Sequence, residues 1–374
     1  MNQVSVICNY IANHPSCWEA DLEALGIKVK AEKDGRAIFN YGIGCDFANP
    51  IVQEARGIII NLNGLDVVCF PFRKFGNYGE SYVDDIDWAN ARVQEKVDGS
   101  IMKVYFFNGK WCVATNGTVD AYTNVGSFCS SGKSYGQLFD EGAKDAGLDY
   151  NKLDPAYTYI FELVSPEAPI VINYPKTTIY HLGTRNNVTG EEIRVDIGVK
   201  KPKEYHLNSL KECIEAAKMI NADTSLDDIK GEGYVVVDGN WHRIKIKSPD
   251  YLQSHYFKTY NNPSDARVIS IIKAGEVDEV CTYFPAFMDS VKAVEAKIEA
   301  LRVSMVNYLK YVEEDAHSLA RKDFFLKHRN EKYCGMATSF FFNAREEAMS
   351  IEDYVDKQID YMPVSKLVDA YEKV

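Results

Sequence analysis

The sequence has no Cys-x-x-Cys pair, no long uninterrupted apolar segment and no excess of positive charge. Its nine cysteines are odd in number and stand singly, so they support neither a zinc site nor a disulfide framework. We therefore expect reduced thiols in a cytoplasmic protein, or in the host cytoplasm if the chain is viral. No stretch approaches about 18 apolar residues, and no basic segment precedes an apolar run at the N-terminus. Secretion and a membrane partner are thus not expected.

The formal net charge of −12 argues against a generic surface for polyanions, because phosphate contacts need exposed lysine and arginine. It is compatible with a basic groove on an acidic body. The densest basic stretch runs from Arg321 to Lys332, and its commonest interpretation is a solvated helix face. A hydrophobic content of 46% over 374 residues is that of a globular chain large enough for two domains.

The pattern along the chain predicts an α+β protein. From Ile38 to about Lys247 it is strand-rich, and the strongest hairpin signal is Asn108-Gly109. The expected strands are 57–60, 67–70, 102–107, 111–115, 157–164 and 178–182, with a helix over 207–220. After about Tyr251 the period becomes helical, with one long amphipathic helix over 286–312 and further helices from 324 and over 351–371. A break is expected at 261–263, where Asn-Asn-Pro interrupts the chain.

The most informative segment is Lys96-Val97-Asp98-Gly99-Ser100, within a stretch that is predicted as strand. A lysine followed by x-Asp-Gly is typical of enzymes that load a nucleotide onto lysine as a phosphoramidate. By itself it is weak, since a chain of this length shows it by chance about one time in ten. It gains weight from three later segments, which follow in the order Phe161-Glu162, Glu232-Gly233-Tyr234 and Lys245-Ile246-Lys247.

The hairpin around Asp238-Gly239-Asn240 predicts how these later segments meet. A turn at Asp238-Gly239 places Glu232 opposite Lys245, and one at Gly239-Asn240 places it opposite Lys247. Because side chains alternate, both registers put the glutamate and both lysines on one face. An odd-length loop or a bulge would break this inference. The common alternative is an exposed strand pair with a cross-strand ion pair worth about 0.2–1 kcal/mol.

These residue types have a shared chemistry if they lie near Lys96. A nucleophilic lysine must lose its proton near neutral pH, against an ordinary pKa of about 10.4. Two further lysines and a metal ion nearby would lower that pKa and would neutralise a phosphate under attack. A carboxylate could hold the divalent metal. Phosphoryl transfer depends mostly on positioning and charge stabilisation, and these residues supply both.

The four segments in this order resemble motifs I, III, IV and V of the covalent nucleotidyltransferase superfamily, which includes DNA ligases, RNA ligases and mRNA capping enzymes. In closer detail the chain resembles the phage-type ATP-dependent RNA ligase 1 family. The segments that carry this closer resemblance are Ala55-Arg56-Gly57-Ile58, Lys74-Phe75-Gly76-Asn77, Phe161-Glu162-Leu163-Val164-Ser165-Pro166 and Lys247-Ser248. The resemblance implies a ligase adenylation domain with antiparallel sheets over residues 1–255. An all-α domain over 256–374 would follow, where DNA ligases and capping enzymes carry an OB-fold.

Position by position, the resemblance makes Lys96 the catalytic nucleophile. It would attack the α-phosphate of ATP, release pyrophosphate and become lysyl-AMP. The AMP would then pass to an RNA 5′-phosphate, and a 3′-hydroxyl would attack to seal the strands. Lys245 and Lys247 would hold the α-phosphate and Glu232 the metal ion, Mg²⁺ or alternatively Mn²⁺. Glu162 would bind the ribose hydroxyls.

Five further positions follow from the same resemblance. Arg56 and Lys74 would contact the β- and γ-phosphates or the incoming RNA 5′-phosphate. Tyr41 matches a nucleotide-contacting tyrosine, and Tyr251 matches a position tied to activity. Asp278 falls near a C-terminal acidic pair that is linked to metal in the family. Without the motif context, lone arginines, lysines and tyrosines are more often solvated or core residues.

Glu95, directly before Lys96, also belongs to the expected nucleotide-binding residues.

The match to the family pattern is not complete at every position. Asn116 takes the place of a basic phosphate contact, and Gly76 replaces the second aromatic of a Phe-Phe-Asn pattern. These departures bear on RNA-end affinity and on the balance between steps. His181, beside an apolar strand, is interpreted as a packed histidine.

The resemblance therefore implies a monomeric, ATP-dependent RNA ligase, with RNA carrying 5′-phosphate and 3′-hydroxyl ends as the partner. Its role would be RNA repair, with a broken tRNA as one structured substrate selected by the helical domain. Two alternatives stay open. One is a DNA ligase or capping-type enzyme of the same superfamily, and the other is an RNA-binding protein that keeps the fold without turnover.

Overall fold

The computed structural model describes residues 4–42, 45–123, 132–220, 231–256, 264–274, 276–342 and 349–372. The chain divides into two compact units, Met1–Tyr260 and Asn261–Val374. The boundary expected after residue 255 falls at the end of helix α6 (Pro249–Tyr256), which belongs to the first unit. The break expected at 261–263 lies outside the described residues, as does Cys129. Each helix in the described ranges is too short or too polar to span a lipid bilayer.

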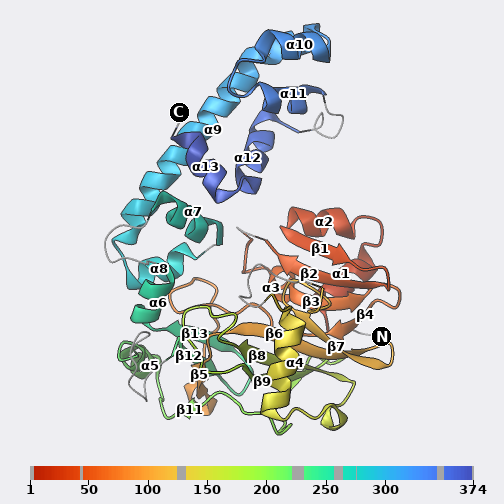
Figure 1. Cartoon of the computed structure of the whole chain (residues 1–374), viewed down its shortest axis with the longest axis vertical. Coiled ribbons are helices and arrows are strands. Elements are labelled where there is room, and N and C mark those ends of the chain that lie inside the picture. Colours follow the sequence, from red (N-terminus) through yellow and green to blue (C-terminus); the bar gives the residue numbers. More distant parts are fainter. Residues whose placement is uncertain are drawn as a thin grey trace. The chain divides into compact units, whose positions relative to one another are not determined.

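The first sheet of the first unit is antiparallel and follows chain order (Figure 1). Its strands are β1 (Ile27–Ala31), β2 (Arg36–Tyr41), β3 (Arg56–Asn61) and β4 (Asp66–Cys69). Helices α1 (Val6–Asn13), α2 (Trp18–Ala24) and α3 (Pro50–Glu54) pack beside it. The two faces belong to two different cores, with Phe39 in one and Ile38 in the other. Burial on both faces explains why β3 is a continuous apolar run.

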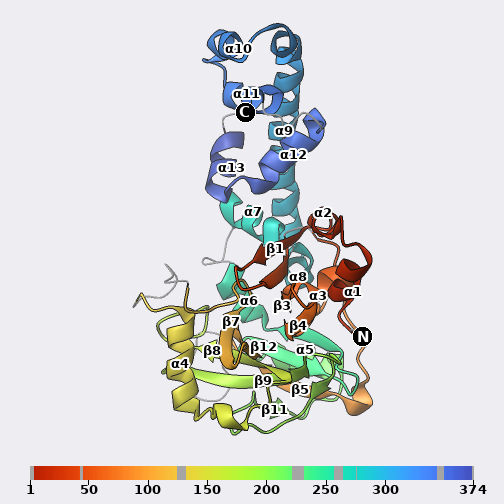
Figure 2. The same cartoon turned by 90° about the vertical axis from the view of Figure 1, so that its right-hand side faces the viewer.

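The second sheet has the order β10-β9-β8-β6-β7 and is also antiparallel. Its strands are β6 (Ser100–Phe107), β7 (Lys110–Thr115), β8 (Tyr157–Val164), β9 (Thr178–Asn186) and β10 (Glu192–Ile193). The predicted hairpin is confirmed, because Asn108 and Gly109 join β6 to β7 with φ values of 48° and 78°. Helix α4 (Tyr135–Ala146) lies along this sheet (Figure 2). It buries Leu138 and Phe139 against Phe161.

The third sheet has the order β11-β5-β12-β13. Its strands are β5 (Arg92–Lys96), β11 (Glu204–Tyr205), β12 (Gly233–Val237) and β13 (Arg243–Lys247). Helix α5 (Leu210–Ala217) packs on the face that carries Val93, Val236 and Ile244. Two 3-10 turns, η1 (Trp88–Asn90) and η2 (Tyr150–Lys152), complete the first unit. The helix expected over 207–220 is shorter at both ends, because α5 spans only Leu210–Ala217.

The segment Lys96–Ser100 is not one strand, contrary to the prediction. Lys96 ends β5 in the third sheet, and Ser100 begins β6 in the second. Val97, Asp98 and Gly99 cross between the two sheets. The two sheets therefore meet at this lysine, because the chain passes from one to the other directly after it.

The second unit consists of helices in its described residues. They are α7 (Asp265–Ala274), α8 (Val277–Tyr283), α9 (Phe287–Ser318), α10 (Arg321–His328), α11 (Cys334–Phe342), α12 (Ile351–Tyr361) and α13 (Val364–Tyr371). The long helix α9 is confirmed and extends beyond its predicted end, and α12 and α13 pack along it (Figure 1). The helical segment expected over 351–371 is interrupted at Pro363, because proline offers no N–H to continue a helix.

Candidate functional site

A cleft of about 160 Å³ opens between the second and third sheets and contains Lys96. We call it the Lys96 cleft. Six of the predicted site residues line it, namely Arg56, Glu95, Lys96, Glu162, Lys245 and Lys247. The other lining residues include apolar side chains, among them Ile101, Leu182, Pro202 and Val235. A cationic part and an apolar part thus share one cavity, a combination that suits a nucleotide, which has a charged phosphate end and an apolar base.

The register of the third sheet places the lysines. Gly233 of β12 pairs with Lys96 on one side and with Lys247 on the other. Val235 pairs with Lys245 two residues further along. Directly paired residues and residues two apart point to the same face of a sheet. Strand geometry therefore brings Lys96, Lys245 and Lys247 to one face, which is the face that lines the cleft.

The predicted register of this hairpin is wrong, although the predicted grouping is present. The loop runs from Asp238 to His242, so Val237 pairs with Arg243. The Asp238 carboxylate holds this five-residue loop by accepting hydrogen bonds from the backbone of Asn240 and His242, at 2.8 and 2.9 Å. The turn residues identify a hairpin, but the number of loop residues depends on such local contacts.

Glu232 reaches the lysines by a route that the register argument did not contain. By strict alternation it would point away from Lys247, since Gly233 is the residue paired with that lysine. Gly233 has a φ of +145°, however, and this breaks the strand geometry. The Glu232 carboxylate makes an ion pair with Lys96 and lies 3.9 Å from Nζ of Lys247. A Cβ at Gly233 would lie 2.7 Å from Cα of Lys247, so only glycine fits here.

The Asp-Gly that follows Lys96 has a structural role. Asp98 is buried, and its carboxylate accepts hydrogen bonds from the backbone N–H groups of Val171 and Ile172 at 2.9 and 2.7 Å. The hydroxyl of Tyr251 on α6 donates to the same carboxylate at 2.7 Å. Gly99 packs against the carbonyl of Leu163, where no Cβ would fit. The segment that directly follows the nucleophile candidate is therefore held in place, and Tyr251 contacts Asp98 without lining the cleft.

Glu162 and Glu95 offer different groups to the cleft. Glu162 lies on β8 and is only 8% exposed. Burial raises the pKa of Glu162 to about 8, opposed by the charge of Lys96. Glu95 pairs with Tyr234, whose side chain lies in the core on the opposite face from Lys96. The backbone of Glu95 is therefore what this residue can present to a ligand.

Arg56 and Lys245 share one aromatic side chain. The Arg56 guanidinium lies 5.1 Å from the centre of the Phe75 ring, and so does Nζ of Lys245. The resemblance drew attention to Lys74 and Gly76 on either side but assigned no role to Phe75. The sequence does contain a signal for this role, because Phe75 directly follows the basic residues Arg73 and Lys74.

Lys74 and Tyr41 are brought together beside the cleft, but neither lines it. The ammonium of Lys74 lies 4.7 Å from the ring centre of Phe47, 5.7 Å from that of Tyr41 and 5.9 Å from that of Tyr82. Phe47 and Tyr82 were not predicted. Three aromatic rings around one ammonium group hold Lys74 in a fixed place by cation–π contacts.

Gly76 stands where the resemblance leads one to expect an aromatic residue, and packing explains the difference. A Cβ at Gly76 would lie 2.6 Å from Cγ1 of Val83. The carbonyl of Gly76 accepts a hydrogen bond from the backbone of Lys245 at 3.0 Å, and Tyr78 donates to the carbonyl of Lys245 at 2.7 Å. The segment thus pairs with β13 and fixes the backbone of Lys245.

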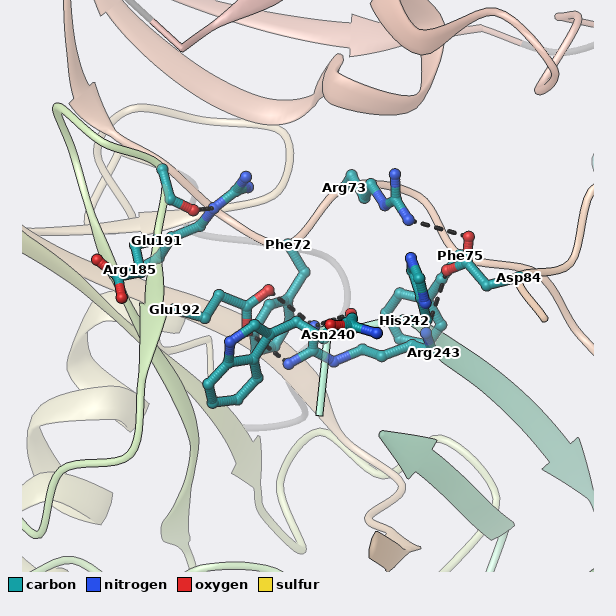
Figure 3. Close-up of a pocket in the computed structure, with 12 residues that line it drawn as sticks. Phe72, Arg73, Phe75, Asp84, Arg185, Glu191, Glu192, Asn240, His242 and Arg243 are labelled. Atoms are coloured by element: carbon teal, nitrogen blue, oxygen red, sulfur yellow. Dashed lines mark hydrogen bonds and ion pairs between the residues drawn. The ribbon is translucent and has the colours of Figure 1, made fainter. Parts of the chain in front are cut away.

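A second cavity, drawn in Figure 3, has a volume of about 260 Å³ and adjoins the Lys96 cleft. The two cavities share Phe72, Phe75 and Arg243. Arg73 makes an ion pair with Asp84 at 2.9 Å, and Arg243 makes a two-point ion pair with Glu192 at 2.6 and 2.8 Å. The lining holds as many carboxylates as arginines. Because its charges balance and are mostly paired, we interpret it as a supporting network behind the cleft.

Two further residues named in the sequence analysis, Asp278 and His181, do not line the Lys96 cleft. Asp278 is on α8 in the second unit. Among the described residues, no group of three or more His, Cys, Asp and Glu side chains could hold a metal ion. His181 is buried, and burial lowers its pKa to about 4. It is a packed histidine, as predicted.

Comparison with known proteins identifies the family. The model of a family described as RNA ligase matches residues 54–259. The chain is 31% identical over 289 residues to a protein of Autographa californica nuclear polyhedrosis virus whose name describes a bifunctional polynucleotide kinase/RNA ligase. That match covers 71% of this chain and 40% of the relative, so the chain spans less than half of that protein. An RNA ligase of Rhodothermus phage RM378 is 26% identical, with coverage of 68% of this chain and 73% of the relative.

Among solved structures, an archaeal ATP-dependent RNA ligase aligns with a TM-score of 0.46 and 15% identity, over 80% of this chain and 83% of that one. An ATP-dependent DNA ligase from Aquifex aeolicus aligns at 0.44 and 12%, over 81% of both chains. The family model alone covers more than half of the chain, and the protein therefore belongs to the RNA ligase family.

Proposed function

We propose that this protein is an ATP-dependent RNA ligase that joins RNA 5′-phosphate and 3′-hydroxyl ends through lysyl-AMP and RNA-adenylate intermediates. The observation that carries the proposal is that Lys96, Lys245 and Lys247 line one cleft, where the Glu232 carboxylate pairs with Lys96 and Lys247. Membership of the RNA ligase family supports the choice of RNA over other acceptors.

In the first step the amine of Lys96 attacks the α-phosphorus of ATP. A bond forms from Nζ to phosphorus, the bond to pyrophosphate breaks, and the proton on Nζ leaves to solvent. The amine is nucleophilic only without its proton, so its ion pair with Glu232 has to open when ATP binds. Lys245 and Lys247, on the same face, then neutralise the charge on the attacked phosphate.

Glu232 is the residue that would hold a divalent cation, Mg²⁺ or Mn²⁺. One carboxylate together with substrate phosphates and water is a usual set of ligands for Mg²⁺. When bound, the ion would neutralise phosphate charge. A contribution of Asp278 from the second unit remains a proposal.

Glu162 and Arg56 would orient the nucleotide. Glu162, whose pKa is raised by burial, would bind the ribose hydroxyls through its carboxyl oxygens. Arg56, held against Phe75, would meet the β- and γ-phosphates in the first step or the RNA 5′-phosphate in the second. In the second step an oxygen of the RNA 5′-phosphate attacks the phosphorus of lysyl-AMP, the bond from that phosphorus to Nζ of Lys96 breaks, and the amine takes up a proton from solvent. In the last step the RNA 3′-oxygen bonds to the 5′-phosphorus, the phosphoanhydride bond to AMP breaks, and the hydroxyl proton passes to solvent.

The helical unit would select the RNA, and a broken tRNA is the structured substrate that we propose for a repair role. Part of the basic stretch 321–332 is neutralised, since Lys327 pairs with Asp315 at 2.5 Å and His328 is buried beside the same carboxylate. Arg321, Lys322 and Arg329 are exposed. These three are the candidates for phosphate contacts.

The proposal is tested with ATP labelled at the α-phosphate and a divalent cation, followed by denaturing electrophoresis and peptide mapping. We expect label on Lys96, lost when 5′-phosphorylated RNA is added and kept with 5′-phosphorylated DNA. Lys96→Ala should abolish labelling, whereas Lys110→Ala, at an exposed lysine of β7, should not. Discharge to DNA would indicate a DNA ligase, and labelling by GTP a capping-type enzyme. No label on protein freed of bound AMP would leave an RNA-binding protein.

A further inference from the structure

Strand β3 contains a β-bulge directly after Arg56. Phe39 of β2 pairs with Ile58, but the next residue, Asn40, pairs with Arg56, so Gly57 is one extra residue on β3. Gly57 has a φ of +78°, the left-handed conformation that is usual for a glycine in such a bulge. The bulge therefore changes which face of the sheet Arg56 occupies.

The extra residue moves Arg56 from one face of the sheet to the other. In a regular strand Arg56 would share a face with Ile58 and Ile60, both of which lie in the core shared with Phe39. With the extra residue, Arg56 instead pairs with Asn40 and shares the face of Ile38, which packs toward the second sheet. A charged side chain is thereby moved from a closed core to the Lys96 cleft, which Arg56 lines.

A buried lysine holds this bulge. Lys103 lies on β6 and has no exposed surface. Its side chain shares the inter-sheet face with Tyr105, and its ammonium donates a hydrogen bond to the carbonyl of Gly57. A Cβ at Gly57 would lie 2.8 Å from this ammonium and 2.7 Å from the carbonyl of Asn116. The bulge is thus enclosed by β6 on one side and by the segment after β7 on the other.

A fully buried lysine at position 103 lowers the stability of the fold. No ion pair joins it to a carboxylate among the described residues, and burial lowers its pKa to about 8, with the neighbouring Arg56 acting in the same direction and Cys69 against it. An apolar side chain of the same length would avoid this cost. An apolar side chain at this position could not make the hydrogen bond that Lys103 donates to the carbonyl of Gly57.

We propose that Lys103 is a positioning residue for the ligase reaction, which fixes the Gly57 bulge and thereby aims Arg56 at the phosphate end of the Lys96 cleft. The inference rests on the proposed function. It also gives Asn116, where the resemblance implied a basic phosphate contact, a different role, because its backbone closes the bulge that Lys103 holds.

The test compares Lys103→Met, Arg56→Ala and the double variant in two separate assays, the rate of lysyl-AMP formation over a range of ATP concentrations and the rate of AMP transfer to 5′-phosphorylated RNA. Lys103→Met keeps the length of the side chain and removes the donor. We expect it to slow the same step as Arg56→Ala, by about tenfold or more. In the double variant the loss should stay within about twofold of Arg56→Ala alone, because both changes remove the same contribution.

Tyr105→Phe is the matched control on the same face of β6, where it removes a buried hydrogen bond to the carbonyl of Val119. Its effect on either step should multiply with that of Arg56→Ala. Lys103→Gln, which keeps a donor, should recover part of the lost rate. If Lys103→Met does not fold, Gly57→Ala perturbs the bulge from the other side and should slow the same step.

Two results would overturn the inference while leaving the proposed function intact. One is a full multiplication of the Lys103→Met and Arg56→Ala losses. The other is a Lys103→Met protein that is less stable to heat but has unchanged rates in both assays. Absence of lysyl-AMP from the wild-type protein would instead remove both the proposed function and this role.

Discussion

Single residues in this protein owe their properties to surroundings that lie far away in the chain. Glu162 belongs to strand β8, but its pKa is raised because other parts of the chain bury it. Gly233 is an ordinary glycine by sequence, yet its φ of +145° turns Glu232 toward Lys96. The identities of these residues were predictable from a family pattern, whereas their conformations and proton affinities follow from tertiary contacts.

Glu162 gives a prediction about pH at the residue scale. Its folded pKa of about 8 lies above the unfolded value of about 4.3, so its contribution to stability is complete at low pH and is lost as pH rises toward 8. Glu162→Gln removes the titrating group. Relative to wild type, the variant should gain stability between pH 4.5 and 8.5 (about the span of the two pKa values), with a slope of at most about 1.4 kcal/mol per pH unit.

Urea unfolding at several pH values measures this difference. Glu19→Gln, at an exposed position of α2, is the control and should show no such trend. The same Glu162→Gln protein should form lysyl-AMP more slowly, because the ribose loses a carboxyl partner. A variant that is less stable than wild type at pH 8.5 would contradict the assignment.

Elements of secondary structure were predicted well where a pattern is local. The Asn108-Gly109 hairpin and the long helix α9 follow from turn chemistry and from helical spacing. The β12–β13 register was wrong, because the loop has five residues held by Asp238 and not two. The bulge at Gly57 left no signal in the sequence pattern beyond a glycine after Arg56. Loop length and bulges depend on contacts between elements, which a periodic pattern does not contain.

Helix α6 gives a prediction at the element scale. Tyr251 donates to the buried Asp98 carboxylate, so Tyr251→Phe leaves that carboxylate with one donor fewer. We expect a loss of about 1–3 kcal/mol in the free energy of unfolding and slower lysyl-AMP formation, because the segment after Lys96 is less firmly held. Tyr10→Phe, which removes a partly exposed hydrogen bond to Asp21, is the control. Unchanged stability and unchanged rate in Tyr251→Phe would refute the anchoring role.

At the scale of the whole molecule, the chain consists of two compact units, and we propose that they divide the tasks of ATP binding and RNA selection. Every residue that lines the Lys96 cleft belongs to the first unit. The second unit contributes α7 to α13, with the exposed cations of α10 and its C-cap. The expected order of a mixed domain followed by a helical one is present, which a change of period from two to 3.6 along a sequence can reveal.

This division predicts the behaviour of a truncated protein. A chain that ends after residue 260 should still form lysyl-AMP, because the residues that we assign to ATP are all retained. Its discharge to structured RNA should fall by at least about tenfold if the helical unit selects the substrate. Asp278→Ala in the full chain is the companion variant. If truncation and Asp278→Ala both abolish lysyl-AMP, Asp278 belongs to the metal site and the division of tasks is wrong.

The sequence by itself determined the class of the protein, the order of its units and the identities of the residues that we assign to the chemistry. This was possible because periodicity and short motifs depend on residues that lie close together in the sequence, and the order of the motifs can be read directly from it. Only the tertiary structure decided that Glu232 pairs with Lys96, that Phe75 holds two cations and that Lys103 supports the bulge beside Arg56. These contacts join residues far apart in the chain, and they arise where three sheets pack together, so no periodic pattern records them.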